Sequence, residues 1–98
     1  MRLSALSAAL FAGLLLAQPV SAKECLKGYY EGTNAPFLSG FELDSAKEHA
    51  VLNWVINVTG QLGLAFTDWE SASDRSFNCR KQGIRYRCTA RAQPCTQG

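Results

Sequence analysis

The sequence predicts an α+β domain in which one amphipathic helix packs on a three-stranded antiparallel sheet, in the chain order αβββ, with disulfide bonds stapling the parts together. Three observations predict this fold. An apolar repeat at three- and four-residue spacing follows Ser45, which is typical of a helix with one buried face. A strict two-residue alternation of apolar and polar side chains runs over residues 84–92, as in a half-buried strand. The third observation is the presence of four cysteines, an even number that can form two disulfides.

The first 22 residues have the features of a cleavable export signal. Arg2 supplies a positive start, an apolar run covers residues 3–17, and Val20-Ser21-Ala22 fits the small-x-small cleavage rule. The run is shorter than the roughly 20 apolar residues of a membrane-spanning helix. We therefore expect cleavage after residue 22 and export of one small domain, residues 23–98, to the periplasm or beyond the cell. No membrane span is expected after cleavage.

Four cysteines lie within residues 23–98: Cys25, Cys79, Cys88 and Cys95. An even number in a short exported chain is typical of two disulfides, each of which stabilises by about 2–4 kcal/mol. A zinc site would need ligands two to four residues apart, whereas the chain has no Cys-x-x-Cys and a single histidine. We expect disulfides and no metal. Three pairings are possible, and the sequence does not choose between them.

Residues 23–44 are predicted to form an irregular arm, because glycine, proline and asparagine interrupt them repeatedly. Cys25 would anchor the start of this arm. Aromatic side chains lie between the interruptions, and each buries a large apolar area when it packs. We expect these aromatic rings to hold the arm against the core.

A helix is predicted over residues 45–60. Ser45 and Glu48 form a capping-box pattern at its start, and Gly60 and Gly63 each offer a C-cap position. The expected apolar face consists of Ala46, Ala50, Val51, Trp54, Val55 and Val58, widened by Leu52 and Ile56. The expected solvent side consists of Lys47, Glu48, Asn53 and Asn57.

Antiparallel strands are predicted within residues 64–92, from runs at 64–70, 76–81 and 84–92. The spacing of Phe66, Trp69 and Ala72 departs from strand alternation, and a bulge or a helical turn near Asp68 would fit it. Gly83 separates the last two runs and predicts a tight hairpin. A Gly83-Ile84 turn would place Cys79 opposite Cys88 in a non-hydrogen-bonded pair, where side chains lie closer. A Gln82-Gly83 turn would instead place Cys79 opposite Tyr86. The sequence leaves both registers open.

Charge is distributed unevenly along the chain. Residues 23–73 carry three lysines against seven acids, a net charge of −4, whereas residues 74–98 carry six basic residues against Asp74 alone, a net charge of +5. The candidate binding residues are the basic side chains of the hairpin: Arg80, Lys81, Arg85, Arg87 and Arg91. If the Gly83-Ile84 turn forms, Arg80 lies opposite Arg87, and like charges in that arrangement destabilise a sheet.

Something anionic is therefore expected beside these arginines. It is either a ligand or the chain's own Asp68, Glu70 or Asp74. An acidic protein surface or an envelope polyanion would suit them, since arginine matches carboxylate and phosphate geometry. Nucleic acid is not expected, because the whole chain carries a formal net charge of only +2.

Little in the sequence points to catalysis. His49 lies on the predicted helix without a spaced nucleophile or acid, and the carboxylates are scattered. Trp54 and Trp69 are interpreted as core or near-core residues. We expect no enzyme activity and no cofactor.

A recurring pattern spans residues 46–95. It consists of a helix tryptophan (Trp54), a Gly-x-x-aromatic-x-x-Trp-x-x-Ala block from Gly63 to Ala72, then Cys79, Cys88 and Pro94-Cys95. The pattern resembles small exported bacterial proteins, and C-terminal domains of larger envelope proteins, that have no assigned function. The resemblance implies an exported bacterial domain with an αβββ core and carries over no catalytic or binding residue. Leu62 stands where the pattern has an aromatic residue, which weakens one packing contact.

The leading functional hypothesis is an exported, non-enzymatic interaction module, a binder or an inhibitor, that uses the arginine-rich face of the C-terminal hairpin. One alternative is a structural or stress-related envelope protein without a specific ligand. Another is a polyanion or glycan binder that uses the same arginines together with an exposed Trp69 or Tyr30. Steep salt dependence would distinguish polyanion binding from binding to a protein.

Overall fold

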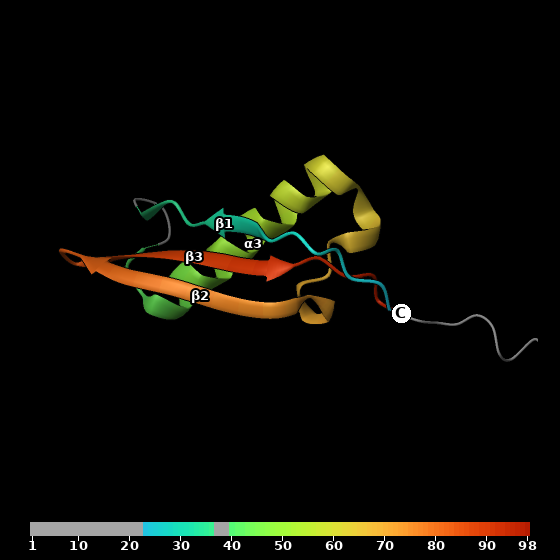
Figure 1. Ribbon diagram of the computed structural model, residues 1–98. Helices are drawn as coiled ribbons and strands as arrows, with labels where there is room; N and C mark the ends of the chain where they lie inside the picture. Colours follow the sequence, from blue (N-terminus) through green and yellow to red (C-terminus); the bar gives the residue numbers. More distant parts are fainter. Residues whose placement is uncertain (1–22, 37–39) are drawn as a thin grey trace, which may run out of the picture.

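The computed structural model describes residues 23–36 and 40–98, so the predicted export signal lies outside the described residues. One helix covers a face of a three-stranded antiparallel sheet, in which β3 is the central strand and β1 and β2 are the edges (Figure 1). The predicted fold class is thereby confirmed. The elements are β1 (Tyr30–Thr33), α3 (Leu43–Leu62), the 3-10 turns η1 (Leu64–Phe66) and η2 (Trp69–Ser71), β2 (Ser73–Gln82) and β3 (Arg85–Gln93).

The first strand comes from the segment that was predicted to be an irregular arm. β1 pairs with β3 in the register Tyr30↔Ala92 and Gly32↔Ala90. The order along the chain is therefore strand, helix, strand, strand, and not αβββ. The arm was misread because a four-residue strand that contains a glycine has almost no pattern of its own, and its pairing partner lies about 60 residues away.

The run at residues 64–70, predicted as a strand, forms the two 3-10 turns η1 and η2 instead. Asp68 explains the second turn, because its carboxylate accepts hydrogen bonds from the Ser71 hydroxyl at 2.7 Å and from the Glu70 amide at 3.3 Å. Such local side-chain bonds compete with strand pairing. The turns also place Trp69 edge-to-face against Trp54, with ring centroids 5.1 Å apart.

The helix begins at Leu43, two residues before the predicted start, with Glu42 at the N-cap position. The predicted capping box is wrong: Ser45 lies inside the helix, and its carbonyl accepts a hydrogen bond from His49 Nδ1 at 2.9 Å. At the other end the helix continues through Gly60 to Leu62. Gly63, at a φ of +87°, closes it by donating its amide to the Thr59 carbonyl.

The buried face of α3 is a single row at four-residue spacing, and the small residues of β3 pack against it. Val51 and Val55 are partly buried beside the row. Leu52 and Ile56, which were predicted to widen the apolar face, are 51% and 59% exposed and lie on the outer side of the helix. The fully buried residues of these two elements are Ala46, Ala50, Trp54 and Val58 of α3 and Cys88, Ala90 and Ala92 of β3.

The helix lies unusually close to β1, and Gly32 makes this possible. A Cβ atom at Gly32 would lie 2.6 Å from the Ala50 carbonyl oxygen and would collide with the backbone nitrogen of Trp54. Asn53 and Asn57, predicted on the solvent side, donate instead to the carbonyls of Thr33 and Glu31, at 2.6 and 3.0 Å. The outer edge of β1 is thereby occupied by helix side chains.

The hairpin forms by the first of the two predicted registers. Gly83 has the positive φ, +67°, that the first position of a type II′ turn requires. Gln82 pairs with Arg85, and Cys79 therefore lies opposite Cys88, with which it forms a disulfide.

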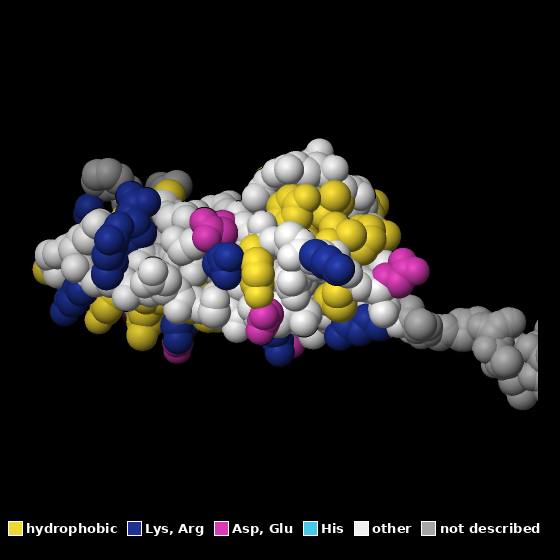
Figure 2. All heavy atoms as spheres, viewed as in Figure 1, with side chains coloured by type: hydrophobic (Ala, Val, Ile, Leu, Met, Phe, Trp, Pro, Cys, Tyr) yellow, Lys and Arg dark blue, Asp and Glu magenta, His cyan; other side chains and the backbone are white. Residues whose placement is uncertain are grey.

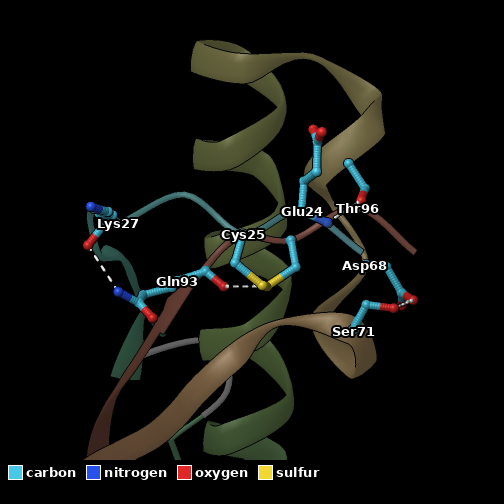
Figure 3. Close-up of a disulfide and its surroundings, with 8 residues drawn as sticks. Glu24, Cys25, Lys27, Asp68, Ser71, Gln93 and Thr96 are labelled. Atoms are coloured by element: carbon cyan, nitrogen blue, oxygen red, sulfur yellow. Dashed lines mark hydrogen bonds between the residues drawn. A yellow bond between two sulfur atoms is a disulfide. The ribbon is translucent and has the colours of Figure 1, made fainter. Parts of the chain in front are cut away.

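The second disulfide, Cys25–Cys95, joins the two ends of the described chain (Figure 3). Leu26 donates its amide to the Pro94 carbonyl at 2.9 Å, and Thr96 donates to the Glu24 carbonyl at 2.8 Å. These bonds align the arm and the C-terminal tail antiparallel on either side of the bridge. None of the helices in the described ranges combines the length and the apolar character that a membrane crossing requires.

Candidate binding surface

Four of the five predicted binding residues gather at one end of the molecule. β2 contributes Arg80 and Lys81, β3 contributes Arg85 and Arg87, and the Gly83 turn joins the two strands. We call these four residues the basic hairpin end. Figure 2 shows dark blue side chains of Lys and Arg gathered at this end of the molecule. This surface is positioned by the disulfide Cys79–Cys88, which fixes the register one pair further into the sheet.

Arg80 and Arg87 are direct cross-strand partners. Their neighbours Cys79 and Cys88 turn toward the core, so by strand alternation the two arginines lie on the face opposite to the helix. Side chains that oppose each other in this way share one face of the sheet, and their Cα atoms lie about 5.5 Å apart in a hydrogen-bonded pair. Two arginine side chains thus project from directly opposed positions on one face of the sheet.

Apolar and aromatic side chains alternate with these charges. The Arg85 guanidinium lies 4.7 Å from the centroid of the Phe41 ring, and the Lys81 ammonium lies 5.6 Å from that of Tyr86. Ile84, at the turn, is 72% exposed. The segment that carries Phe41 is held to β3 by a hydrogen bond from the Tyr86 amide to the Gly40 carbonyl. The surface is therefore amphipathic and is not a purely charged patch.

The three acids that might have neutralised this surface are engaged elsewhere. Glu70 forms an ion pair with Arg75 at 3.1 Å. Asp74 accepts a hydrogen bond from the Tyr29 hydroxyl, and Asp68 accepts from Ser71 and Gln97. Among residues 23–36 and 40–98, ion pairs join Arg75 to Glu70 and Arg91 to Glu31, and neither pair includes Arg80, Lys81 or Arg87.

Arg91, the fifth predicted residue, belongs to a separate group. It lies four residues along β3 from Arg87, which corresponds to about 13 Å. Its Nε atom lies 3.5 Å from the carboxylate of Glu31, its cross-strand partner, and its guanidinium stacks 3.7 Å from the centroid of the Tyr29 ring. Arg91 is thus paired with a carboxylate and an aromatic ring of the protein itself, although its side chain remains exposed at 47%.

The Arg91 group borders an open groove of about 530 Å³ between β1 and the C-terminal half of α3, where Asn57 and Gln61 line the helix side. The hydrogen bond that Tyr29 donates to Asp74 raises the pKa of the phenol above its usual value. Sequence reasoning missed this groove, because it depends on β1 and on the contact between Arg91 and Tyr29. No periodicity in the sequence indicates either of them.

Trp69 does not offer a free stacking platform for a sugar ring. It is partly buried, packs against Trp54, and lies 5.6 Å from Phe77 between ring centroids. Arg75 lies 6.0 Å from the indole. Tyr30, the other proposed platform, is also partly buried against the core. Beside Trp69 is a smaller pocket of about 290 Å³, lined by Lys47, Glu48, Val51, Trp69, Glu70 and Phe77.

Within residues 23–36 and 40–98, no three His, Cys, Asp or Glu side chains converge in a way that would hold a metal ion. His49 is tied to its own helix by the bond to Ser45. At Asp68 the hydrogen bond from Ser71 (Figure 3) lowers the pKa of the carboxyl. Hydrogen bonds from Gln97 and from the Glu70 amide lower it further. This carboxylate caps η2 and also binds the C-terminal tail.

Comparison with protein-family models, with curated proteins and with solved structures gave no match to this chain.

Proposed function

We propose that this protein is an exported, non-enzymatic interaction module whose basic hairpin end binds an acidic surface of another protein. One observation carries the proposal: Arg80 and Arg87 stand opposite each other, and no ion pair of the described residues neutralises them. Like charges in direct opposition cost stability. An anion supplied by a partner would relieve the repulsion between the two arginines and form charge-assisted hydrogen bonds with them, which would contribute affinity and specificity.

The mixture of side chains favours a protein partner over a polyanion. Arginine and aromatic residues are enriched at protein interfaces, and this surface combines Arg85 on Phe41 with the exposed Ile84. A polyanion binder, by contrast, draws on many cations and a high net charge, and this chain carries a formal net charge of +2.

Export is proposed from the N-terminal signal and is compatible with the two disulfides, which form and persist in oxidising compartments. The resemblance to small exported bacterial proteins supports the same compartment. A periplasmic or secreted module of this kind would act by binding alone.

The test is affinity capture from a cell-envelope extract with three oxidised baits: the wild type, Arg80→Glu/Arg87→Glu, and Lys23→Glu/Lys27→Glu. The last variant makes the same change in net charge at exposed lysines near the opposite end of the molecule. We expect one acidic protein to be retained by the wild type and by the lysine variant. Its affinity for the hairpin variant should be at least about tenfold weaker, since two charges at the centre of a contact are lost.

Equal retention on all three baits would contradict the proposal and favour a structural envelope protein without a specific ligand. Retention of anionic polysaccharide in place of a protein, with affinity falling steeply as salt rises, would favour the polyanion alternative.

A further inference from the structure

The two edge strands of the sheet, β1 and β2, differ in whether their outward backbone groups are hydrogen-bonded. At β1 the helix asparagines Asn53 and Asn57 occupy the outward carbonyls. At β2 no strand of the described residues pairs with the outer side, and β2 is ten residues long (Figure 1). An unpaired strand edge is a ready template for another strand. The outer edge of β2 is therefore a candidate site for an added strand.

The register identifies the backbone groups of this open edge. Cys88 directs its carbonyl and its amide away from β2, where they bond to the Asn34 amide at 3.2 Å and to Asn34 Oδ1 at 2.7 Å. Cys79–Cys88 is therefore a non-hydrogen-bonded pair, and Cys79 directs its own N–H and C=O away from β3. By alternation the same holds for Phe77 and Lys81. Within residues 23–36 and 40–98, the outward N–H and C=O groups of these three residues form no backbone–backbone hydrogen bond.

The side chains along the edge indicate the chemistry of the occupant. On the face away from the helix lies Arg80, beside Arg87. On the helix side lies Phe77, which together with Val51 and Trp69 lines the pocket of about 290 Å³. A strand laid along β2 would thus meet Arg80 on one face. On the other face it would meet a pocket in which Val51, Trp69 and Phe77 are bordered by Lys47, Glu48 and Glu70.

We infer that the acidic partner binds by adding an extended segment to the outer edge of β2 as a fourth strand, with acidic side chains toward Arg80 and an apolar side chain in the pocket of Phe77 and Trp69. This inference rests on the proposed function and names the form of its partner. Strand addition gains affinity from main-chain hydrogen bonds and specificity from alternate side chains. A second copy of β2 fits poorly, because Arg75, Arg80 and Lys81 outnumber Asp74 on this strand.

The test uses a synthetic peptide of alternating glutamate and valine, about eight residues long to match the open edge. Amide hydrogen exchange of the protein is followed by NMR with and without the peptide. We expect new protection at the amides of Phe77, Cys79 and Lys81. Those of Asn78 and Arg80, already paired with β3, should change little.

Two matched controls isolate the backbone contribution. The same peptide with alternate amides N-methylated keeps its charge but cannot pair with the edge.

On the protein, Lys81→Pro removes a charge and an outward N–H, whereas Lys81→Gln removes only the charge. Proline is tolerated at such edge positions. We expect the proline variant to bind the peptide roughly fivefold more weakly than the glutamine variant, since one hydrogen bond is lost. The NMR spectrum of each variant shows whether it is folded, and the N-methylated peptide tests the inference without any change to the protein.

The outcomes separate the inference from the proposed function. Equal binding of the plain and N-methylated peptides, both weakened by Arg80→Glu/Arg87→Glu, would overturn strand addition and leave the basic hairpin end as an acid-binding surface. If neither N-methylation of the peptide nor Arg80→Glu/Arg87→Glu weakened binding, both strand addition and the proposed function would be overturned. Failure of the peptide to bind, when the acidic protein is still captured through the hairpin end, would overturn strand addition alone. Edge protection that rises with protein concentration in the absence of peptide would identify a second copy as the occupant and overturn the inference.

Discussion

Gly32 shows how much one residue decides in this small domain. Its missing side chain allows the backbone of β1 to lie directly against the backbone of α3 at Ala50 and Trp54. In the sequence this glycine looks like one of several interruptions in a loop. Its role depends on a helix that begins eleven residues later, and no local pattern predicts such a contact.

Substitution of Gly32 by alanine is expected to destabilise the fold by about 1–3 kcal/mol, because the surrounding atoms are main chain and cannot move aside as a side chain would. Gly28→Ala is the control, since a Cβ atom at Gly28 would meet nothing within 4 Å. Denaturant unfolding of the two variants measures the difference. Equal midpoints would show that β1 and α3 can separate without cost.

At the scale of elements, the contact between α3 and the edge of β1 depends on two asparagines of unequal burial. Asn53 donates to the Thr33 carbonyl in a partly buried position, whereas the bond from Asn57 to Glu31 is exposed. Loss of a bond that leaves a buried carbonyl unsatisfied costs more than loss of one that water can replace.

Asn53→Ala should therefore lower the free energy of unfolding by about 1–3 kcal/mol, and Asn57→Ala by less than about 1 kcal/mol. Thermal or denaturant unfolding checks the ranking. A larger loss of stability for Asn57→Ala than for Asn53→Ala would contradict the assignment of these two bonds as the contacts that hold β1 against α3.

The elements that sequence reasoning found are those with a local signal. The helix has its periodicity, and the hairpin has alternation and the Gly83 turn, so its four basic residues were predicted to lie together. The elements that it missed or left open depend on distant partners. β1 depends on β3, and the turns at 64–71, of which only a bulge or a helical turn near Asp68 was suggested, depend on the packing of Trp69 against Trp54. For the same reason the sequence did not separate Arg91 from the basic hairpin end. Its partners Tyr29 and Glu31 lie about 60 residues away.

At the scale of the whole molecule, the two disulfides close loops of very different length. Cys25 and Cys95 are 70 residues apart in sequence, and Cys79 and Cys88 are 9 apart. A longer loop removes more conformational entropy from the unfolded chain when it is closed.

Removal of the long-range bridge by Cys25→Ala/Cys95→Ala is expected to cost about 4 kcal/mol, against about 2–3 kcal/mol for Cys79→Ala/Cys88→Ala. Calorimetric or denaturant unfolding of the two double variants gives both values. A larger loss from the hairpin bridge would mean that packing around the buried Cys88 outweighs the chain-entropy effect.

The Cys25–Cys95 bridge also has a mechanical consequence. A pulling force applied to the chain at residues 23 and 98 passes from one sulfur to the other and bypasses the residues enclosed between them. The helix and sheet are then outside the line of tension, and the hairpin, at the far end in Figure 1, keeps its shape under load. After reduction the same force would act directly on the hydrogen bonds that align the arm with the tail, and the sheet would open from β1.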